Sequence, residues 1–106
     1  GPDRGLDPSG FMYYIKDHGW VVVRDSARKH GISDGDTLHA LAHAMVTLPR
    51  VDRPPGGTLH LGPDGAGRLL EVVSVREGGD VHRVIHAMPM RRGYERQLRE
   101  VRGDVG

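Results

Sequence analysis

The sequence predicts an α+β fold in which a small antiparallel sheet of about four strands follows a pair of helices and precedes a third helix. Three segments rich in glycine or proline, at 53–57, 62–67 and 77–80, fall at hairpin spacing. The runs beside them are of strand length and rich in leucine and β-branched residues. Apolar residues recur at helical spacing before and after this region, so we expect a meander sheet flanked by helices.

The helix after residue 33 has the clearest pattern. Ser33, with Asp36 three residues later, is typical of a capping box. The apolar residues that follow at the spacing of one helical face are Leu38, Leu41, Ala42 and Met45. We therefore expect a helix from about Asp34 to Met45 that packs this stripe on the sheet.

A shorter helix is expected just before it. Asp25 can cap a helix that passes through Ala27 to His30, and Gly31 has the backbone freedom that a helix C-terminus often requires. These two helices make up the predicted N-terminal helical pair. The runs "FMYYIK" and "WVVVR", within residues 11–24, are compatible with one or two further short strands.

Four strands and a terminal helix follow. The strand segments are "MVTLP", "TLHL", "LLEVVSV" and "VHRVIH". After Pro89, Tyr94, Leu98 and Val101 recur at helical spacing with arginines between them. This pattern predicts a terminal helix with one apolar stripe against the sheet.

Length and charge indicate one domain with at most a local nucleic-acid site. A chain of 106 residues supports one modest core, and we assign residues 11–106 to a single domain. Residues 1–10 are expected to be a flexible tail, partly derived from an expression tag, because Gly-Pro is a common remnant of tag cleavage. The formal charge of +1 gives no bulk attraction for nucleic acid.

Cysteine usage and hydropathy bear on location. The sequence has no cysteine, which excludes disulfides and thiolate chemistry and favours the cytoplasm. No apolar run approaches the roughly 18 residues of a membrane span, and no signal peptide is evident. We expect a soluble cytoplasmic protein that does not contact membranes.

The most basic part of the chain is its C-terminal segment. Five arginines lie within twelve residues, offset by Glu95 and Glu100; they are Arg91, Arg92, Arg96, Arg99 and Arg102. The planar guanidinium suits phosphate oxygens and stays charged at any working pH. The alternative interpretation is a solvated helix face held by local Glu–Arg pairs.

His86 ends the last predicted strand, just before this basic segment. An imidazole can take the proton of a ribose 2′-hydroxyl or protonate a leaving 5′-oxygen, while arginines stabilise charge on phosphorus. Glu71 lies in the most apolar strand, where a carboxylate must find a partner or face solvent. Two interpretations are open: it pairs with an arginine such as Arg83 on a neighbouring strand, or it serves as a base. Lys29 and His30 form a second cationic pair near a helix end, where both also fit a plain surface role.

Two other functions are less well supported by the sequence. His39 and His43 lie four apart on a helix, and His82 and His86 alternate onto one strand face, but neither pair has further metal ligands nearby. The segment "SARKHGISDGDTLHAL" resembles a helix-turn-helix, yet residues 31–49 contain no Lys or Arg to contact phosphates. We expect neither a metal nor a cofactor.

The motif "ARKHGIS" at 27–33, together with a terminal strand leading through His86 to Arg91, Arg92 and Tyr94, resembles BrnT-like toxins of type II toxin-antitoxin systems. The similarity covers about residues 20–98. It implies a RelE-like ribonuclease fold with a helical hairpin, an antiparallel sheet and a terminal helix. One departure concerns "IHAMPM", where the family usually has a small hydroxyl residue and an arginine.

The resemblance also implies partners. It implies an RNA substrate and a small cognate antitoxin that covers the basic site, so DNA is contacted only indirectly, through the antitoxin's DNA-binding part. A homo-oligomer or a toxin-antitoxin hetero-oligomer is compatible with this picture. By position, the resemblance assigns functional roles to Lys29, His30, Arg83, His86, Arg91, Arg92 and Tyr94.

The predicted function is metal-independent RNA cleavage, in which a 2′-hydroxyl attacks the adjacent phosphate. The predicted catalytic residues are His86, Arg91, Arg83, Lys29 and Glu71, and the predicted RNA-binding residues are Arg92, Tyr94, His30 and Arg96. His86 would act as acid or base, and Tyr94 would stack on a base. The alternative is a non-catalytic module that binds nucleic acid or protein through the Arg-rich terminal helix.

Overall fold

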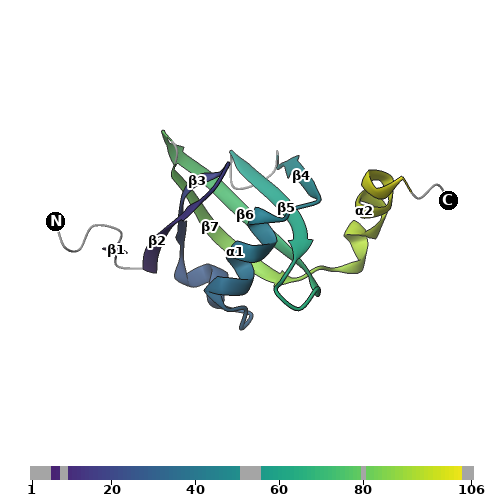
Figure 1. Cartoon of the computed structure of the whole chain (residues 1–106), viewed down its shortest axis with the longest axis horizontal. Helices are drawn as coiled ribbons and strands as arrows, with labels where there is room; N and C mark the ends of the chain where they lie inside the picture. The colour runs from purple at the N-terminus through teal and green to yellow at the C-terminus, as the bar shows by residue number, and fades with distance from the viewer. Residues whose placement is uncertain (1–5, 8–9, 51–55, 80, 104–106) are drawn as a thin grey trace.

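The structure, a computed structural model, describes residues 6–7, 10–50, 56–79 and 81–103 (Figure 1). The strands are β1 (Leu6–Asp7), β2 (Gly10–Ile15), β3 (Gly19–Val23), β4 (Val46–Pro49), β5 (Gly57–Pro63), β6 (Leu69–Gly78) and β7 (Val81–Pro89). The helices are the 3-10 turn η1 (Asp25–Arg28), α1 (Asp34–Ala42), the 3-10 turn η2 (Arg92–Tyr94) and α2 (Glu95–Arg102). Of the tail predicted at residues 1–10, positions 1–5 and 8–9 lie outside the described residues. Of the segment rich in glycine and proline at 53–57, positions 53–55 lie outside them.

The strands form one sheet in the order β1-β2-β3-β7-β6-β5-β4. Strand β1 has two residues and pairs only with β2, so β2 to β7 make up the body of the sheet. Every neighbouring pair is antiparallel except β3 and β7, which run parallel with Trp20 opposite Val81 and Val23 opposite Val84. The sheet is therefore mixed, and its N-terminal hairpin lies beside its last strand.

The predicted fold of a four-stranded antiparallel meander behind an N-terminal helical pair is wrong. The meander segments are strands β4 to β7, but β2 and β3 extend the sheet and add a parallel pair. The run Val21–Val23 explains why: all three residues are buried, as in a strand covered on both faces. Only α1 of the expected helical pair is an α-helix, because residues 25–28 form a single 3-10 turn.

Helix α1 begins where the sequence predicts and ends earlier. The Ser33 side chain accepts a hydrogen bond from the Asp36 backbone N–H at 3.1 Å, which is the expected cap. The helix ends at Ala42, and the Met45 N–H donates to the Leu61 carbonyl at 2.7 Å. Met45 has thus already joined the edge of β5 and is exposed, instead of completing the apolar stripe.

Each face of the sheet carries its own apolar core. On the face covered by α1, Ala40 and Leu41 of the helix cluster with Val72 of β6 and Val84 of β7. On the opposite face, Leu98 of α2 clusters with Leu59, Leu61 and Val73. We call these the α1 side and the α2 side of the sheet.

A β-bulge in β7 changes which face its side chains reach. His86 pairs with Val73 and Val84 pairs with Ser74, so Ile85 is an extra residue between two register positions. Val84 consequently lies on the α1 side, whereas His86 shares the α2 side with Val73. The prediction that His82 and His86 share one face is wrong for this reason.

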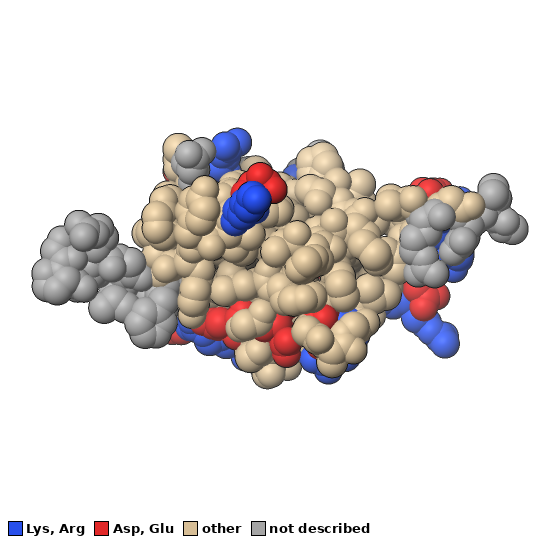
Figure 2. Space-filling view, viewed as in Figure 1, with Lys and Arg blue, Asp and Glu red and all other residues tan. Residues whose placement is uncertain are grey.

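Figure 2 shows the α1 side of the molecule. Charged side chains are sparse over its middle and gather along its lower edge, where Figure 1 has η1, the start of α1 and the β5–β6 turn. Several of them are paired there: Arg28 with Asp25 and Asp34, and Arg68 with Asp64. Charge along this edge is therefore largely balanced.

Within the described part of the chain, no helix is long and apolar enough to cross a membrane.

The packing of α1 on β5 predicts a sharp effect at Gly62. A Cβ at Gly62 would lie 2.3 Å from the Ala40 carbonyl oxygen and 3.0 Å from the Ala44 Cα, so a Gly62→Ala variant must displace the helix. Overpacking of this kind costs about 1–3 kcal/mol or more. Thermal denaturation should show a clear fall in Tm.

The matched control is Gly35→Ala, in the first turn of α1. A Cβ there has nothing closer than the Ser33 Oγ at 3.9 Å. Its Tm should be unchanged or higher, since alanine favours a helix over glycine. Equal Tm values for the two variants would contradict the close helix–strand contact.

Candidate active site

Glu71 is a buried carboxylate in the middle of β6. It lies on the α2 side, opposite Leu61 on β5 and Met88 on β7, and is 1% exposed. It accepts four hydrogen bonds, of which three come from Arg91 and one from His86. A buried carboxylate needs such donors, because removal from water is costly without them.

Arg91 binds Glu71 with both its backbone and its side chain. Its backbone N–H and its Nε each donate to Glu71 Oε1 at 3.0 Å, and its Nη2 donates to Oε2 at 2.7 Å. Arg91 immediately precedes η2, so these bonds fix the chain where it leaves the sheet toward α2. Arg83 on a neighbouring strand was one candidate partner of Glu71, with a role as a base as the alternative; the arginine that binds Glu71 lies beyond the strand, and Arg83 pairs with Glu77.

His86 is the second partner of Glu71. Its Nε2 lies 3.0 Å from Glu71 Oε2. An ionised carboxylate only accepts hydrogen bonds, so Nε2 carries the proton and Nδ1 is left to exchange one. Within the described residues Nδ1 has no hydrogen-bond partner, and the side chain is partly exposed.

His30 lies against His86. Their ring centroids are 5.7 Å apart with an interplanar angle of 75°, an edge-to-face contact. His30 follows η1, which packs along β7 beyond the end of β3. The predicted second cationic pair is thus brought to the last strand by η1, although Lys29 itself is exposed.

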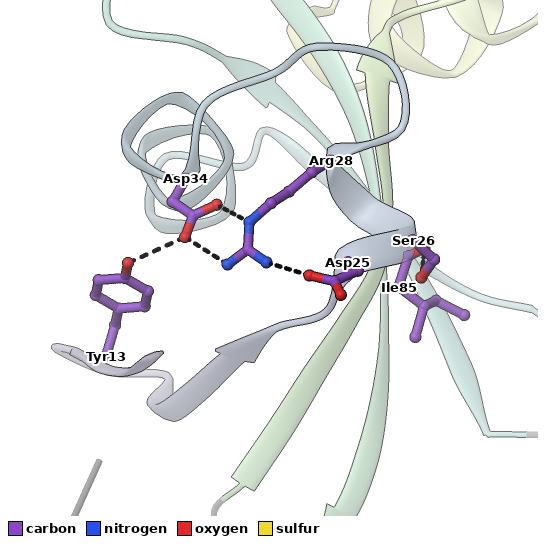
Figure 3. Close-up of polar contacts among 6 residues, drawn as sticks. All are labelled: Tyr13, Asp25, Ser26, Arg28, Asp34 and Ile85. Carbon is purple, nitrogen blue, oxygen red and sulfur yellow. Dashed lines mark hydrogen bonds and ion pairs between the residues drawn. The ribbon is translucent and has the colours of Figure 1, made fainter. Parts of the chain in front are cut away.

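Two contacts hold η1 in this position (Figure 3). The Ser26 hydroxyl donates to the carbonyl of the bulged residue Ile85 at 2.7 Å. Arg28 donates from Nε and Nη2 to the two carboxylate oxygens of Asp34, both at 2.9 Å, and from Nη1 to Asp25 at 2.8 Å. These bonds connect η1 with the bulge on one side and with the start of α1 on the other.

Tyr13 of β2 completes that network. Its hydroxyl donates to Asp34 Oδ2 at 3.0 Å. Hydrogen bonds from Arg28 and Tyr13, partly opposed by burial, lower the pKa of Asp34. Neither Ser26 nor Asp34 was identified from the sequence, because a hydroxyl or carboxylate at a helix start is explained equally well by local capping.

The electrostatic state of the site follows from Glu71. Burial raises its pKa, but hydrogen bonds from the Arg91 side chain and backbone and from His86 outweigh burial and hold the pKa below its usual value. Glu71 is therefore ionised at neutral pH. Its carboxylate also raises the pKa of the Arg91 guanidinium.

Of the remaining predicted site residues, Arg83, Arg92 and Arg96 are not gathered with these four, whereas Tyr94 interacts with the Arg91 side chain and helps to raise its pKa. Arg83 pairs with Glu77 at 2.7 Å, toward the other end of β7. Arg96 is exposed on α2 with only a 3.9 Å contact to Glu100. Arg92 is exposed in η2, and Tyr94 is half-buried against the apolar cluster of the α2 side, which leaves only part of its ring for stacking.

The second histidine pair is a helix-surface feature. The rings of His39 and His43 lie 4.3 Å apart, and His39 Nδ1 is 2.8 Å from the Pro63 carbonyl oxygen. No group of three or more His, Asp or Glu residues in the described ranges is arranged to hold a metal ion.

Comparisons of the chain with protein-family models, with curated proteins and with solved structures found no significant match. A buried carboxylate that fixes the tautomer of a partly exposed imidazole makes that imidazole an effective proton donor and acceptor. The arrangement suits general acid–base chemistry at His86.

The pKa of Glu71 predicts a pH-dependent contribution to stability. Because the folded pKa lies below the unfolded value of about 4.5, the carboxylate stabilises the fold above that pH, and this stabilisation is lost as the pH falls through the folded pKa. At pH 7 we expect Glu71→Gln to lower the free energy of unfolding by roughly 1–3 kcal/mol, less than for a fully buried pair because Arg91 is 60% exposed. The difference from wild type should shrink below pH 4.5.

Urea denaturation from pH 3 to pH 8 measures this difference. Asp34 also has a lowered pKa and affects both proteins alike, so only the difference curve reports on Glu71. A difference that stays constant across the range would contradict the ionised Glu71 pair.

The hydrogen bond of Ser26 to Ile85 predicts that its removal destabilises the bulge in β7 locally. Ser26→Ala removes the hydroxyl that binds the Ile85 carbonyl and should cost about 1 kcal/mol. Amide hydrogen exchange near Ile85 and His86 should accelerate by more than the loss of global stability accounts for. Ser33→Ala, which removes the α1 cap at a similar expected cost, should leave exchange in β7 unchanged relative to stability.

Proposed function

We propose that the protein is a ribonuclease that cleaves RNA without a metal ion, with His86 as its proton-transfer residue. The observation that carries this proposal is the hydrogen bond between buried Glu71 and the Nε2 atom of partly exposed His86. In the reaction, the ribose 2′-hydroxyl attacks the adjacent phosphorus and the 5′-oxygen leaves, giving a 2′,3′-cyclic phosphate. His86 transfers a proton at Nδ1, while Glu71 orients the ring through its bond to Nε2.

The phosphate in this proposal is held by cations around His86. Arg91 directs Nε and Nη2 to Glu71, so it contributes mainly charge and position. Lys29 and Arg92 are both exposed and have no ion pair with any described residue, so their charges are available to a phosphate. His30, in contact with His86, is the second imidazole that the substrate would meet.

The toxin role implied by the sequence resemblance belongs to the same proposal. A ribonuclease free in the cytoplasm would cleave cellular RNA and inhibit growth, and a cognate antitoxin that covers His86 and Arg92 would restrain it. Arg83 and Arg96 are not part of the proposed catalytic group, because Arg83 is paired with Glu77 and Arg96 lies on α2.

A non-catalytic binding module is the second candidate. It is favoured by one observation: His86 Nε2 and two guanidinium nitrogens of Arg91 are already bonded to Glu71, so much of their hydrogen-bonding capacity is used within the protein. In that case Arg92, Arg96 and Arg99, all exposed, would supply salt-sensitive phosphate contacts without bond cleavage.

The cleavage proposal predicts a large effect at His86. Incubation of the purified protein with end-labelled RNA should give fragments with 2′,3′-cyclic phosphate ends, both with and without EDTA. His86→Ala should reduce the cleavage rate about 10²- to 10⁴-fold, the usual contribution of a general acid–base group. His43→Ala, which removes an exposed histidine of α1, is the matched control and should cleave at the wild-type rate.

Three outcomes would contradict the proposal of metal-independent RNA cleavage. Equal rates for His86→Ala and wild type would remove His86 from the mechanism. Binding that weakens with salt but yields no new RNA ends would favour the binding module, and cleavage abolished by EDTA would exclude a metal-independent reaction.

A further inference from the structure

Two large aromatic side chains, Tyr14 and Trp20, are open to solvent on the α2 side of the sheet. Tyr14 is 63% exposed and Trp20 is 43% exposed. Tyr14 pairs with Trp20 between β2 and β3, and Trp20 pairs with Val81 at the start of β7. Successive side chains of a strand point to opposite faces. Trp20 and its partner Tyr14 therefore lie on the face opposite to Val21, which belongs to the core of the α1 side.

Helix α2 covers the other part of this face. Leu98 of α2 packs on buried residues of β5 and β6, and α2 also contacts β4. In Figure 1, α2 lies at the other end of the molecule from β2 and β3. The exposed fractions of Tyr14 and Trp20 show that the surface over β2 and β3 is open in the described part of the chain.

The two aromatic rings support each other. Their centroids are 5.1 Å apart and their planes meet at 69°, an edge-to-face contact. Each ring thus restrains the other, although both side chains project toward solvent. Aromatic side chains on an open sheet surface are the elements on which several RNA-binding domains stack unpaired bases.

The same face leads along β7 to His86. Val22 follows Trp20 by two residues and so shares its face, and Arg83 of β7 lies opposite Val22. The bulge places His86 on this face as well. Val81, the partner of Trp20, precedes His86 by five residues, which corresponds to roughly 16 Å of extended strand. A few nucleotides of extended RNA can span such a distance.

The charge between the aromatic pair and His86 is nearly balanced. Arg83 donates from Nη1 to Glu77 Oε2 at 2.7 Å, so the two side chains largely neutralise each other. Attraction for RNA along this stretch has to come from base stacking, because there is no surplus of positive charge in the pair. Stacking of this kind selects unpaired bases, since a duplex hides the faces of its bases.

We propose that Tyr14 and Trp20 stack bases of a single-stranded RNA that lies along the α2 side, with the phosphate to be cleaved at His86. The proposal rests on the cleavage function proposed above and adds a substrate class to it: RNA with several unpaired nucleotides beside the cleaved bond. Stacking uses the faces of the bases and not their hydrogen-bonding edges, so this pair gives little sequence preference. A dinucleotide would occupy His86 without reaching the aromatic pair.

The single tryptophan of the chain reports on binding directly. The ligand is an adenylate oligomer with 2′-O-methyl groups, which lacks the attacking hydroxyl and is not cleaved. Its titration into the full-length protein should change the fluorescence of Trp20, because a base packs on the indole or on the Tyr14 ring beside it. The same oligomer annealed to its complement should give a much smaller change. An unchanged fluorescence with the single-stranded oligomer would overturn the proposal.

Variants of Tyr14 test stacking while Trp20 still reports. Tyr14→Leu should weaken binding of the oligomer about tenfold, a usual contribution of one stacked base. Tyr14→Phe keeps the ring and should bind like the wild type, which excludes a role for the hydroxyl. Met45→Ala removes an exposed apolar side chain beside β4, at the opposite edge of the sheet, and is the matched control with unchanged binding. Equal affinities of Tyr14→Leu and wild type would contradict stacking.

Cleavage assays separate this proposal from the function on which it rests. With an unmodified adenylate oligomer, Tyr14→Leu should raise KM about tenfold and leave kcat nearly unchanged. Adenylyl-adenosine should be cleaved equally well by Tyr14→Leu and by the wild type. An equal loss on both substrates would assign Tyr14 a structural role and overturn the stacking proposal.

His86→Ala distinguishes failure of the two proposals. This variant should bind the 2′-O-methyl oligomer and change the fluorescence of Trp20 like the wild type, because the aromatic pair lies away from His86. Binding that is intact in a protein without any cleavage activity would reject the cleavage proposal alone. Cleavage by a protein whose Trp20 does not respond to the oligomer would reject the stacking proposal alone.

Exposed aromatic side chains also suit a protein interface, for which a second copy of this chain is the simplest occupant. In that case sedimentation should show a dimer that Tyr14→Leu dissociates, and Trp20 should not respond to RNA. This result would overturn the proposal. A monomer whose Trp20 responds to the single-stranded oligomer supports RNA as the occupant.

Discussion

Glu71 is an ionised side chain in the middle of a strand whose neighbours are buried valines and leucines, and its carboxylate cannot remain there without donors. The donors come from outside the strand: one from His86 on β7 and three from Arg91, just beyond β7. This requirement determines the path of the chain after the sheet. It fixes the direction in which η2 and α2 leave, and it brings Glu71, His86 and Arg91 together on the α2 side.

The bulge at Ile85 is the second constraint, because it divides the histidines of β7 between two faces. Without the extra residue, His86 would lie on the α1 side, beneath η1 and α1, and Glu71 would lack its imidazole partner. The Ser26 hydroxyl donates to the carbonyl of the bulged residue Ile85. Local backbone irregularity thus creates the acid–base pair, and η1 stabilises that irregularity from the sheet edge.

The sequence predicts the structural features that are determined by neighbouring residues, but not the features that are determined by pairing between distant segments of the chain. The capping of α1 by Ser33 and the positions of the meander strands are local properties and are present. The parallel pairing of β3 with β7 has no local signal, so the sheet was predicted too small. Glu71 was expected to need a partner, but identifying Arg91 requires the path of the chain beyond Pro89. The bulge involves no glycine or proline that could have marked it.

The parallel β3–β7 pair has a consequence for how the protein reaches its native state. Strands β4 to β7 pair in chain order and lie close together in the sequence, so each pairing closes only a short stretch of chain and can form early. Residues Trp20 and Val81 are far apart in the chain, so their pairing must await a large loss of chain entropy. As long as the N-terminal hairpin is undocked, β7 presents an unpaired hydrogen-bonding edge, which is a site where chains can associate; the parallel β3–β7 pairing covers this edge.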